Sequence, residues 1–169
     1  KLGTVNIAAA AVVNAGGYNV LATTLTLDAS AVLNLSTGVV SGNIKGLSDG
    51  VGSVNFSDDN TIGGNVGMTE YALAAIDIAA SKTLTANNNG LKATAITLND
   101  SSVLTLTTGS LSGAVTMDSN SIINVTSGAF SGTIQALNNN QGTINFTSGT
   151  NSLNATLGAT SHVINAINI

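Results

Sequence analysis

Apolar and polar residues alternate along many short stretches of this chain. Leu33-Asn34-Leu35, Leu104-Thr105-Leu106 and Ile123-Asn124-Val125 each place two apolar side chains on one side of an extended backbone and a polar one on the other. The apolar segments are three to five residues long and end at Thr-Gly, Ser-Gly, Gly-Gly or Asn-Asn pairs, which favour turns. The pattern predicts many short β-strands joined by tight turns.

A short repeat recurs after 19 residues, so that Gly109 matches Gly128 and Leu111 matches Phe130. A repeat of this length with two or three short strands is typical of one layer of a stack. Strands of successive layers in a parallel sheet lie ~4.8 Å apart. We predict an all-β, parallel β-solenoid (β-helix) of about nine coils of roughly 19 residues, on the order of 40 Å long, with no caps within the chain.

A long repeat divides the same chain into residues 5–75, residues 76–166 and a third copy that begins at residue 167. The second copy equals the first plus one inserted 19-residue unit and one extra residue. An insertion tolerated as a whole unit indicates one layer of a stack, so residues 1–169 form a single predicted solenoid segment. The alanine-rich residues 72–80 are the nearest helix candidate, but they align with residues 5–9 and are predicted to be a strand.

Stacking also predicts columns of like residues, because equivalent positions of successive coils lie above one another. We expect Leu33, Leu104 and Ile123 to form an interior column, and Asn34, Thr105 and Asn124 to form an outward polar row. Asp28, Asn99 and Asp118 should line an exterior turn. Gly38, Gly109 and Gly128 should form a corner that requires a positive φ. Bare ends of such a stack expose unpaired strand edges.

The composition restricts the partners. Charged residues make up 7% of the chain, against roughly 25% in a typical soluble domain. With a net charge of −4, no arginine, and only Lys1, Lys45, Lys82 and Lys92, the chain cannot neutralise a phosphate path, so no nucleic-acid partner is predicted. Its apolar runs are shorter than the ~18 residues of a membrane-spanning helix, and it has no cysteine for disulfides or thiol chemistry.

Asp58-Asp59 is the one adjacent carboxylate pair, the arrangement that glycan lyases and hydrolases on β-helices use as acid, base or calcium ligand. Its counterpart, residues 147–151, has no carboxylate, and the chain has no tryptophan or arginine to hold a sugar. Calcium at Asp49, Asp58 and Asp59 is the alternative, although the Gly-Gly-x-Gly-x-Asp pattern is missing. We predict no catalytic residue, no cofactor and no metal site.

The remaining chemical candidates have structural interpretations. His162 aligns with Tyr71, and Glu70 aligns with Ser161, so neither position requires an ionisable group. The asparagine runs 87–89 and 138–140 are typical of exposed corner loops, with partner binding as the minority alternative. Asn34 and Asn145 begin glycosylation sequons of a kind that arises often in a chain rich in Asn, Ser and Thr. The mixed row Asn34, Thr105 and Asn124 argues against ice binding.

The phrases Leu2-Gly3-Thr4-Val5-Asn6-Ile7, Gly52-Ser53-Val54-Asn55-Phe56 and Gly142-Thr143-Ile144-Asn145-Phe146, followed by residues 62–67 or 153–158, resemble repeats of the rickettsial outer-membrane proteins A and B. The resemblance covers essentially the whole chain and implies an autotransporter passenger, a β-solenoid exported through a C-terminal barrel and displayed on the bacterial surface for adhesion. It carries over no functional residue, because that family has no catalytic motif to match.

Together these observations predict a non-catalytic, extracellular structural or adhesive β-solenoid whose partners are host-cell or neighbouring-cell surface proteins. The alternative is a self-assembling subunit that stacks end to end into a filament or surface layer. A polysaccharide-cleaving enzyme is disfavoured because the chain lacks charged and aromatic clusters. The chain starts in mid-pattern without a signal peptide, so we expect it to be a piece of a longer protein.

Overall fold

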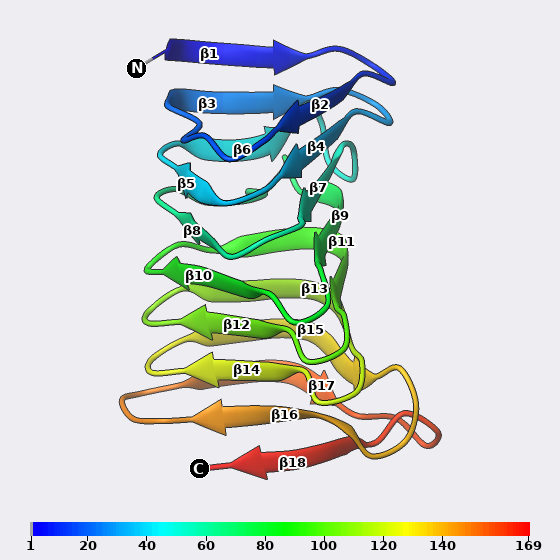
Figure 1. The fold of residues 1–169 in the computed structure, drawn as a ribbon. Helices are drawn as coiled ribbons and strands as arrows, with labels where there is room; N and C mark the ends of the chain where they lie inside the picture. The colour runs from blue at the N-terminus through cyan, green and yellow to red at the C-terminus, as the bar shows by residue number, and fades with distance from the viewer. Residues whose placement is uncertain (1) are drawn as a thin grey trace.

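The computed structural model describes residues 2–169, and Lys1 lies outside the described residues. These residues form parallel strands arranged on three faces of one stack (Figure 1). The first face consists of β1 (Leu2–Ile7), β3 (Ala22–Leu27) and β6 (Asn43–Gly46), and continues through Val66 into the first halves of β11 (Leu91–Leu98), β13 (Ser110–Met117), β15 (Ala129–Ala136) and β17 (Ser152–Leu157).

The second face consists of β2 (Val12–Ala15), β4 (Val32–Leu35), β7 (Ser53–Phe56) and β9 (Leu73–Ile78), followed by the second halves of β11, β13, β15 and β17. The third face consists of β5 (Gly38–Val40), β8 (Asn60–Ile62), β10 (Thr83–Asn87), β12 (Val103–Leu106), β14 (Ile122–Val125), β16 (Gln141–Phe146) and β18 (Ile164–Asn168). The parallel β-solenoid is therefore confirmed, and residues 72–80 contain a strand, as predicted.

The number and length of the coils differ slightly from the prediction. The eight-stranded sheet of the second face has one strand per turn, so the stack has about eight turns rather than nine. Val115 pairs with Ile134, 19 positions on, but Asn60 pairs with Leu84, 24 positions on. The longer turns arise because some contain an extra loop, such as the turn Met68–Tyr71 between Asn60 and Leu84. The two ends of the described chain lie at opposite ends of the stack (Figure 1).

The core consists of columns of apolar side chains that run along the stack. Alternation along inner strands such as β4, β7, β12 and β14 buries every second residue, as in β12, where Leu104 and Leu106 are fully buried. On the first face one column contains Val5, Leu25, Ile44, Val66, Leu91, Leu111, Phe130 and Leu153. Each fully buried side chain of this size contributes about 1.5–3 kcal/mol, which offsets the entropy lost by ordering the chain.

The predicted columns are correct within a long repeat and wrong between the two. Leu104 pairs directly with Ile123 on the third face, as expected, but Leu33 pairs with Val54 on the second face. For the same reason Asn34 lies outside the predicted polar row, whereas Thr105 and Asn124 are paired as predicted. Asp28 follows the first face, whereas Asn99 and Asp118 follow the second, so the predicted exterior turn is also divided between two corners.

The division arises because a long repeat is not a whole number of turns. From Val5 the first-face column takes three steps to Val66, and Ile76 then lies on the next face. From Ile76 the second-face column takes four steps to Leu157, and Ile167 lies on the third face. Each long repeat is therefore rotated by one face relative to the one before it. The inserted 19-residue unit is one turn, as predicted.

The positive φ predicted for the glycine corner is correct for Gly38 and wrong for Gly109 and Gly128. Gly38 has a φ of 149°, but Gly109 and Gly128 have no positive φ. A Cβ on Gly109 would collide with the carbonyl oxygen of Asn89, so close approach of the neighbouring coil excludes a side chain there. Positive φ instead occurs at the third position of tight turns, where non-glycine residues such as Ser101 (58°) and Asn120 (57°) lie.

Two turns on adjacent coils each bury a serine hydroxyl, and they differ in whether that hydroxyl is hydrogen-bonded. Ser102 and Ser121 both end a turn and are fully buried. The Ser121 Oγ donates to the carbonyl of Asp118 at 2.7 Å, whereas the Ser102 Oγ is without a hydrogen-bond partner. Ala31 ends the corresponding turn of the first long repeat, so a methyl group fits this place.

Replacing Ser102 with alanine is therefore expected to leave the free energy of unfolding unchanged or raise it, because a buried hydroxyl without a partner is destabilising. Ser121→Ala should lower it by about 0.5–1.5 kcal/mol, the contribution of one hydrogen bond. Urea unfolding followed by circular dichroism measures both variants. A larger loss for Ser102→Ala than for Ser121→Ala would contradict the assignment.

None of residues 2–169 forms a helix of the length and apolar character needed to cross a membrane.

Candidate functional site

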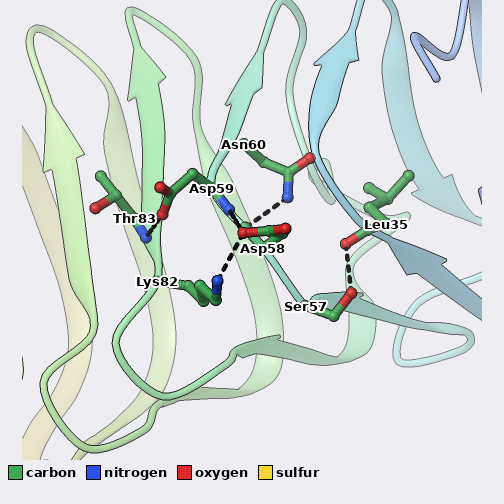
Figure 2. A network of polar contacts seen from close by, with 7 residues as sticks. All are labelled: Leu35, Ser57, Asp58, Asp59, Asn60, Lys82 and Thr83. Atoms are coloured by element: carbon green, nitrogen blue, oxygen red, sulfur yellow. Dashed lines mark hydrogen bonds and ion pairs between the residues drawn. The ribbon is translucent and has the colours of Figure 1, made fainter. Parts of the chain in front are cut away.

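The carboxylate pair Asp58-Asp59 lies at the corner between β7 and β8, where the chain passes from the second to the third face. Ser57 begins this corner and ties it to the preceding coil, because its backbone N–H and its Oγ both donate to the carbonyl of Leu35, at 2.8 and 3.0 Å. Asn60 ends the corner, and its side-chain amide donates to the carbonyl of Asp58 at 2.7 Å. Figure 2 shows the two carboxylates held between these bonds and the next coil.

Asp58 forms the one ion pair among the described residues. The Nζ of Lys82 lies 2.7 Å from its Oδ1, and the backbone N–H of Asp59 donates to the same oxygen at 2.9 Å. The hydrogen bond from Lys82, followed by that from Asp59, holds the pKa of Asp58 below its ordinary value of 3.8. The bond to Asp58 likewise raises the pKa of Lys82 above 10.5. Both side chains are about one-third exposed, at 34% and 35%, so water and salt screen the pair.

Asp59 is directed to the same neighbouring coil by a different contact. Its Oδ1 accepts the backbone N–H of Thr83 at 2.7 Å, at the start of β10 (Figure 2). The two adjacent carboxylates thus bind one side chain and one backbone group of the following turn. Because Asp58 remains ionised and paired at neutral pH, it is poorly suited to act as a general acid. The arrangement joins two coils.

Substituting Asp58 with asparagine tests this contact through its pH dependence. A carboxyl whose pKa is lowered on folding stabilises the folded state above its ordinary pKa of 3.8, and this contribution disappears as the pH falls through the lowered value. The stability difference between wild type and Asp58→Asn should therefore be constant near neutral pH and decrease below about pH 3.8. Urea unfolding at a series of pH values measures it.

Lys82→Met provides the matched variant for this measurement. If the ion pair causes the effect, Asp58→Asn should cost less stability in the Lys82→Met background than in wild type. Equal costs in the two backgrounds would contradict a coupling between the side chains.

Asp49 makes a contact separate from those of Asp58 and Asp59. Its Oδ1 accepts the backbone N–H of Ala72 at 3.0 Å, and the equivalent Asn139 accepts that of Val163 at 3.1 Å in the second long repeat. An uncharged amide thus performs the same task. Within residues 2–169 no three carboxylate or histidine side chains come together in one group of the kind that could hold a metal ion, and Asp49 joins a different pair of segments from Asp58 and Asp59.

His162 and Tyr71 occupy equivalent tight turns, as their alignment predicted. Met68–Tyr71 and Ala159–His162 are each closed by backbone hydrogen bonds between their first and last residues. His162 Nδ1 lies 3.1 and 3.0 Å from the carbonyl oxygens of Ala136 and Leu137, which accept and so place the proton on that nitrogen. The ring of Tyr71 instead faces the Nζ of Lys45, 3.9 Å from the ring centroid. Glu70 is exposed within its turn, at a φ of 66°.

Two ladders of asparagine side chains run along the outside of the stack, and neither was predicted with its correct members. On the second face the Nδ2 of Asn34 donates to Asn14, and that of Asn55 to Asn34, at 2.7 and 2.8 Å. On the third face Asn145 donates to Asn124, and Asn168 to Asn145, at 2.8 and 2.7 Å. The asparagines of both sequons have their amide nitrogens bound in these ladders. The recurrence of apolar-Asn-apolar triplets every 20 to 23 residues is the sequence signal that marks them.

The predicted asparagine loops also have the expected backbone. Asn87 and Asn140 have φ values of 51° and 60°, and the side chain of Asn89 bonds the carbonyls of Ile62 and Ala86. A separate, shallow groove of about 450 Å³ lies on the first face next to the turn Met68–Tyr71. Hydroxyl, amide and ammonium groups line it, from Asn65, Thr69, Lys92, Ser110, Ser112 and Ser131. The groove is therefore polar, and Lys92 is the one charged residue that lines it.

The structure is thus a parallel β-solenoid in which carboxylate and amide side chains connect successive coils. Comparison of the chain with protein-family models, with curated proteins and with solved structures gives no significant match.

Proposed function

We propose that this chain is a non-catalytic, extracellular structural and adhesive β-solenoid of the passenger type displayed on bacterial surfaces. The observation that carries the proposal is the use of its polar side chains: the one adjacent carboxylate pair and the asparagines of both ladders bind the neighbouring coil. In an enzyme these groups would have to be available to a substrate. Here they stiffen a rod.

The adhesive part of the proposal is supported by the chemistry of the surface. Outward Thr and Ser residues such as Thr105, Ser112 and Ser131, which are not members of the ladders, present hydroxyls that bind partners through many weak contacts and without long-range charge steering. A long stack repeats such contacts at each coil, and their combined strength exceeds that of any one. The resemblance to the rickettsial surface proteins supports the same role and a place on the bacterial cell surface.

Three measurements on the purified chain test this function. The chain should bind intact host or neighbouring bacterial cells saturably, and it should resist a protease of broad specificity far longer than the same chain in urea, because paired backbone is inaccessible to proteases. A screen of polysaccharides should show no cleavage. Cleavage of any glycan would overturn the non-catalytic role, and rapid digestion of the folded chain together with absent cell binding would overturn the structural and adhesive one.

A further inference from the structure

We propose that the groove beside the turn Met68–Tyr71 binds an acidic glycan, a saccharide chain that carries carboxylates. The groove lies on the first face and has a volume of about 450 Å³. The inference rests on the proposed adhesive function, for which it names the class of ligand. Its support is the shape of the groove, the polar groups that line it and the one cation among them.

The floor of the groove runs along the stack. It consists of the outward residues on either side of four stacked core residues, Val66, Leu91, Leu111 and Phe130. The groove therefore crosses four coils, and at ~4.8 Å per coil it is about 14 Å long, enough for a few sugar units. Gly67, Gly90 and Ala129 add no bulk to this floor. A further coil lies on each side of it, because Ile44 precedes Val66 and Leu153 follows Phe130.

Most polar side chains of the groove are not used by the fold. Within residues 2–169 no hydrogen bond engages the hydroxyls of Thr69, Ser110, Ser112 and Ser131. Asn65 is engaged on one side only, because its Oδ1 accepts the backbone N–H of Gly90 at 2.7 Å while its Nδ2 has no acceptor among the described residues. The asparagines of the ladders, by contrast, donate to the neighbouring coil. Hydroxyls that donate and accept, with an amide donor beside them, are suited to bind the hydroxyls of a sugar.

Lys92 is the cation of the groove. It is half-buried, and among the described residues its Nζ pairs with no carboxylate. Glu70 lies in the adjoining turn but does not line the groove. Lys45 lies two coils away in the same outward row, with Gly67 between them, and its Nζ faces the ring of Tyr71. An ammonium group beside hydroxyl and amide donors, with no carboxylate in the lining, favours an anionic ligand.

A saccharide fits this groove better than a peptide or a nucleic acid does. The strands beneath the groove are paired on both sides, so a peptide finds no strand edge to extend. Met68 is the one large apolar residue of the lining, which leaves no pocket for the anchor side chains of a protein partner. One lysine cannot neutralise a row of phosphates. A glycan with spaced carboxylates needs one ammonium group and several hydroxyls, and the groove provides both.

Titration of the isotope-labelled chain with a hyaluronan oligosaccharide, followed through amide NMR shifts, tests the proposal. Every second sugar of this probe carries a carboxylate, and the same oligosaccharide with its carboxyls reduced to alcohols is the matched control. The amides of Gly67, Gly90 and Lys92 should shift saturably with the acidic probe. The reduced probe should bind at least about tenfold more weakly, because the charge-assisted bond is lost. Absent shifts, shifts centred on another face, or equal affinity for both probes would overturn the proposal.

Substitutions in the groove should weaken binding of the acidic probe. Lys92→Met removes the charge and keeps the aliphatic stem, and it should raise the dissociation constant at least about tenfold. Ser112→Ala should raise it about two- to fivefold and leave urea unfolding unchanged, since this hydroxyl bonds nothing in the described chain. Lys82→Met makes the same change in net charge at the corner before β10 and should bind like wild type.

Circular dichroism confirms that each variant is folded, and Lys92→Gln replaces Lys92→Met if the latter unfolds. Unchanged binding by Lys92→Met, or equal weakening by Lys82→Met, would contradict a site in this groove. Cell binding separates the inference from the proposed function. A chain that binds cells but not the acidic probe overturns the inference alone, whereas one that binds the probe but no cells overturns the adhesive role alone.

Discussion

Ile96→Ala is expected to lower the free energy of unfolding by about 2–5 kcal/mol, the range for truncating a buried aliphatic side chain to alanine. Ile96 is fully buried in the second-face column, between Ile76 and Val115 of the adjacent coils. Alanine leaves a cavity that both neighbours line, and a tightly hydrogen-bonded ladder cannot collapse to fill it. Urea unfolding of the purified variant measures the loss.

Thr97→Ala is the matched control, because Thr97 follows directly in β11 and points outward. Its effect should stay within about 0.5 kcal/mol, as is usual for surface substitutions. A slip of one residue in strand register exchanges the inner and outer positions. A larger effect at Thr97 than at Ile96 would therefore show that the register is wrong.

Gly67→Ala is expected to lower the free energy of unfolding by about 2–4 kcal/mol, because backbone strain and steric overlap act together. Gly67 has a φ of 77°, and its N–H donates to the carbonyl of Ile44 at 2.7 Å. A Cβ at this position would overlap the carbonyl group of Lys92 in the following coil, which is backbone and cannot rotate away. The two coils would have to separate locally, at the point where Val66 carries the first face from β6 to β11.

Gly50→Ala separates the two causes, since Gly50 has a similar φ of 73° but a Cβ there would meet only the Thr94 Oγ1, at an ordinary 3.6 Å. Its loss should be only the cost of a left-handed backbone, about 1–2 kcal/mol. The equivalent position of the second repeat is Asn140, at a φ of 60°, so a side chain is accommodated there. Equal losses for Gly67→Ala and Gly50→Ala would contradict the close contact with Lys92.

The fold could be predicted from local repetition. Leu104 and Ile123 are one short repeat apart, and the structure pairs them, because alternation specifies which side chains are buried and a constant layer length specifies what lies above them. Leu33 could not be placed by the same reasoning. Leu33 does align with Leu104 in the sequence. The face on which a strand lies, however, depends on the total number of residues in all the corners between the two positions. Turns of 19 to 25 residues obscure that sum.

The candidate site was predictable in its members and not in its contacts. Asp58 and Asp59 are recognisable as the single adjacent pair of carboxylates, but their partners Lys82 and Thr83 lie 24 residues on, in a coil of unusual length. The asparagine ladders were missed for the same reason, since each depends on which face the strand occupies. Gly109 shows a related limit. The neighbouring coil leaves no room for a side chain at this position, but the sequence does not distinguish such a glycine from one that a turn requires.

The rotation of each long repeat by one face has a consequence for the outline of the rod. The loop at residues 47–51 joins the first face to the second, whereas its equivalent at residues 137–141 joins the second to the third. The equivalent loops of the two long repeats therefore protrude at different corners of the rod. A partner that contacts one of these loops therefore finds the equivalent loop not directly above it but at the next corner, so the two loops face different directions around the axis.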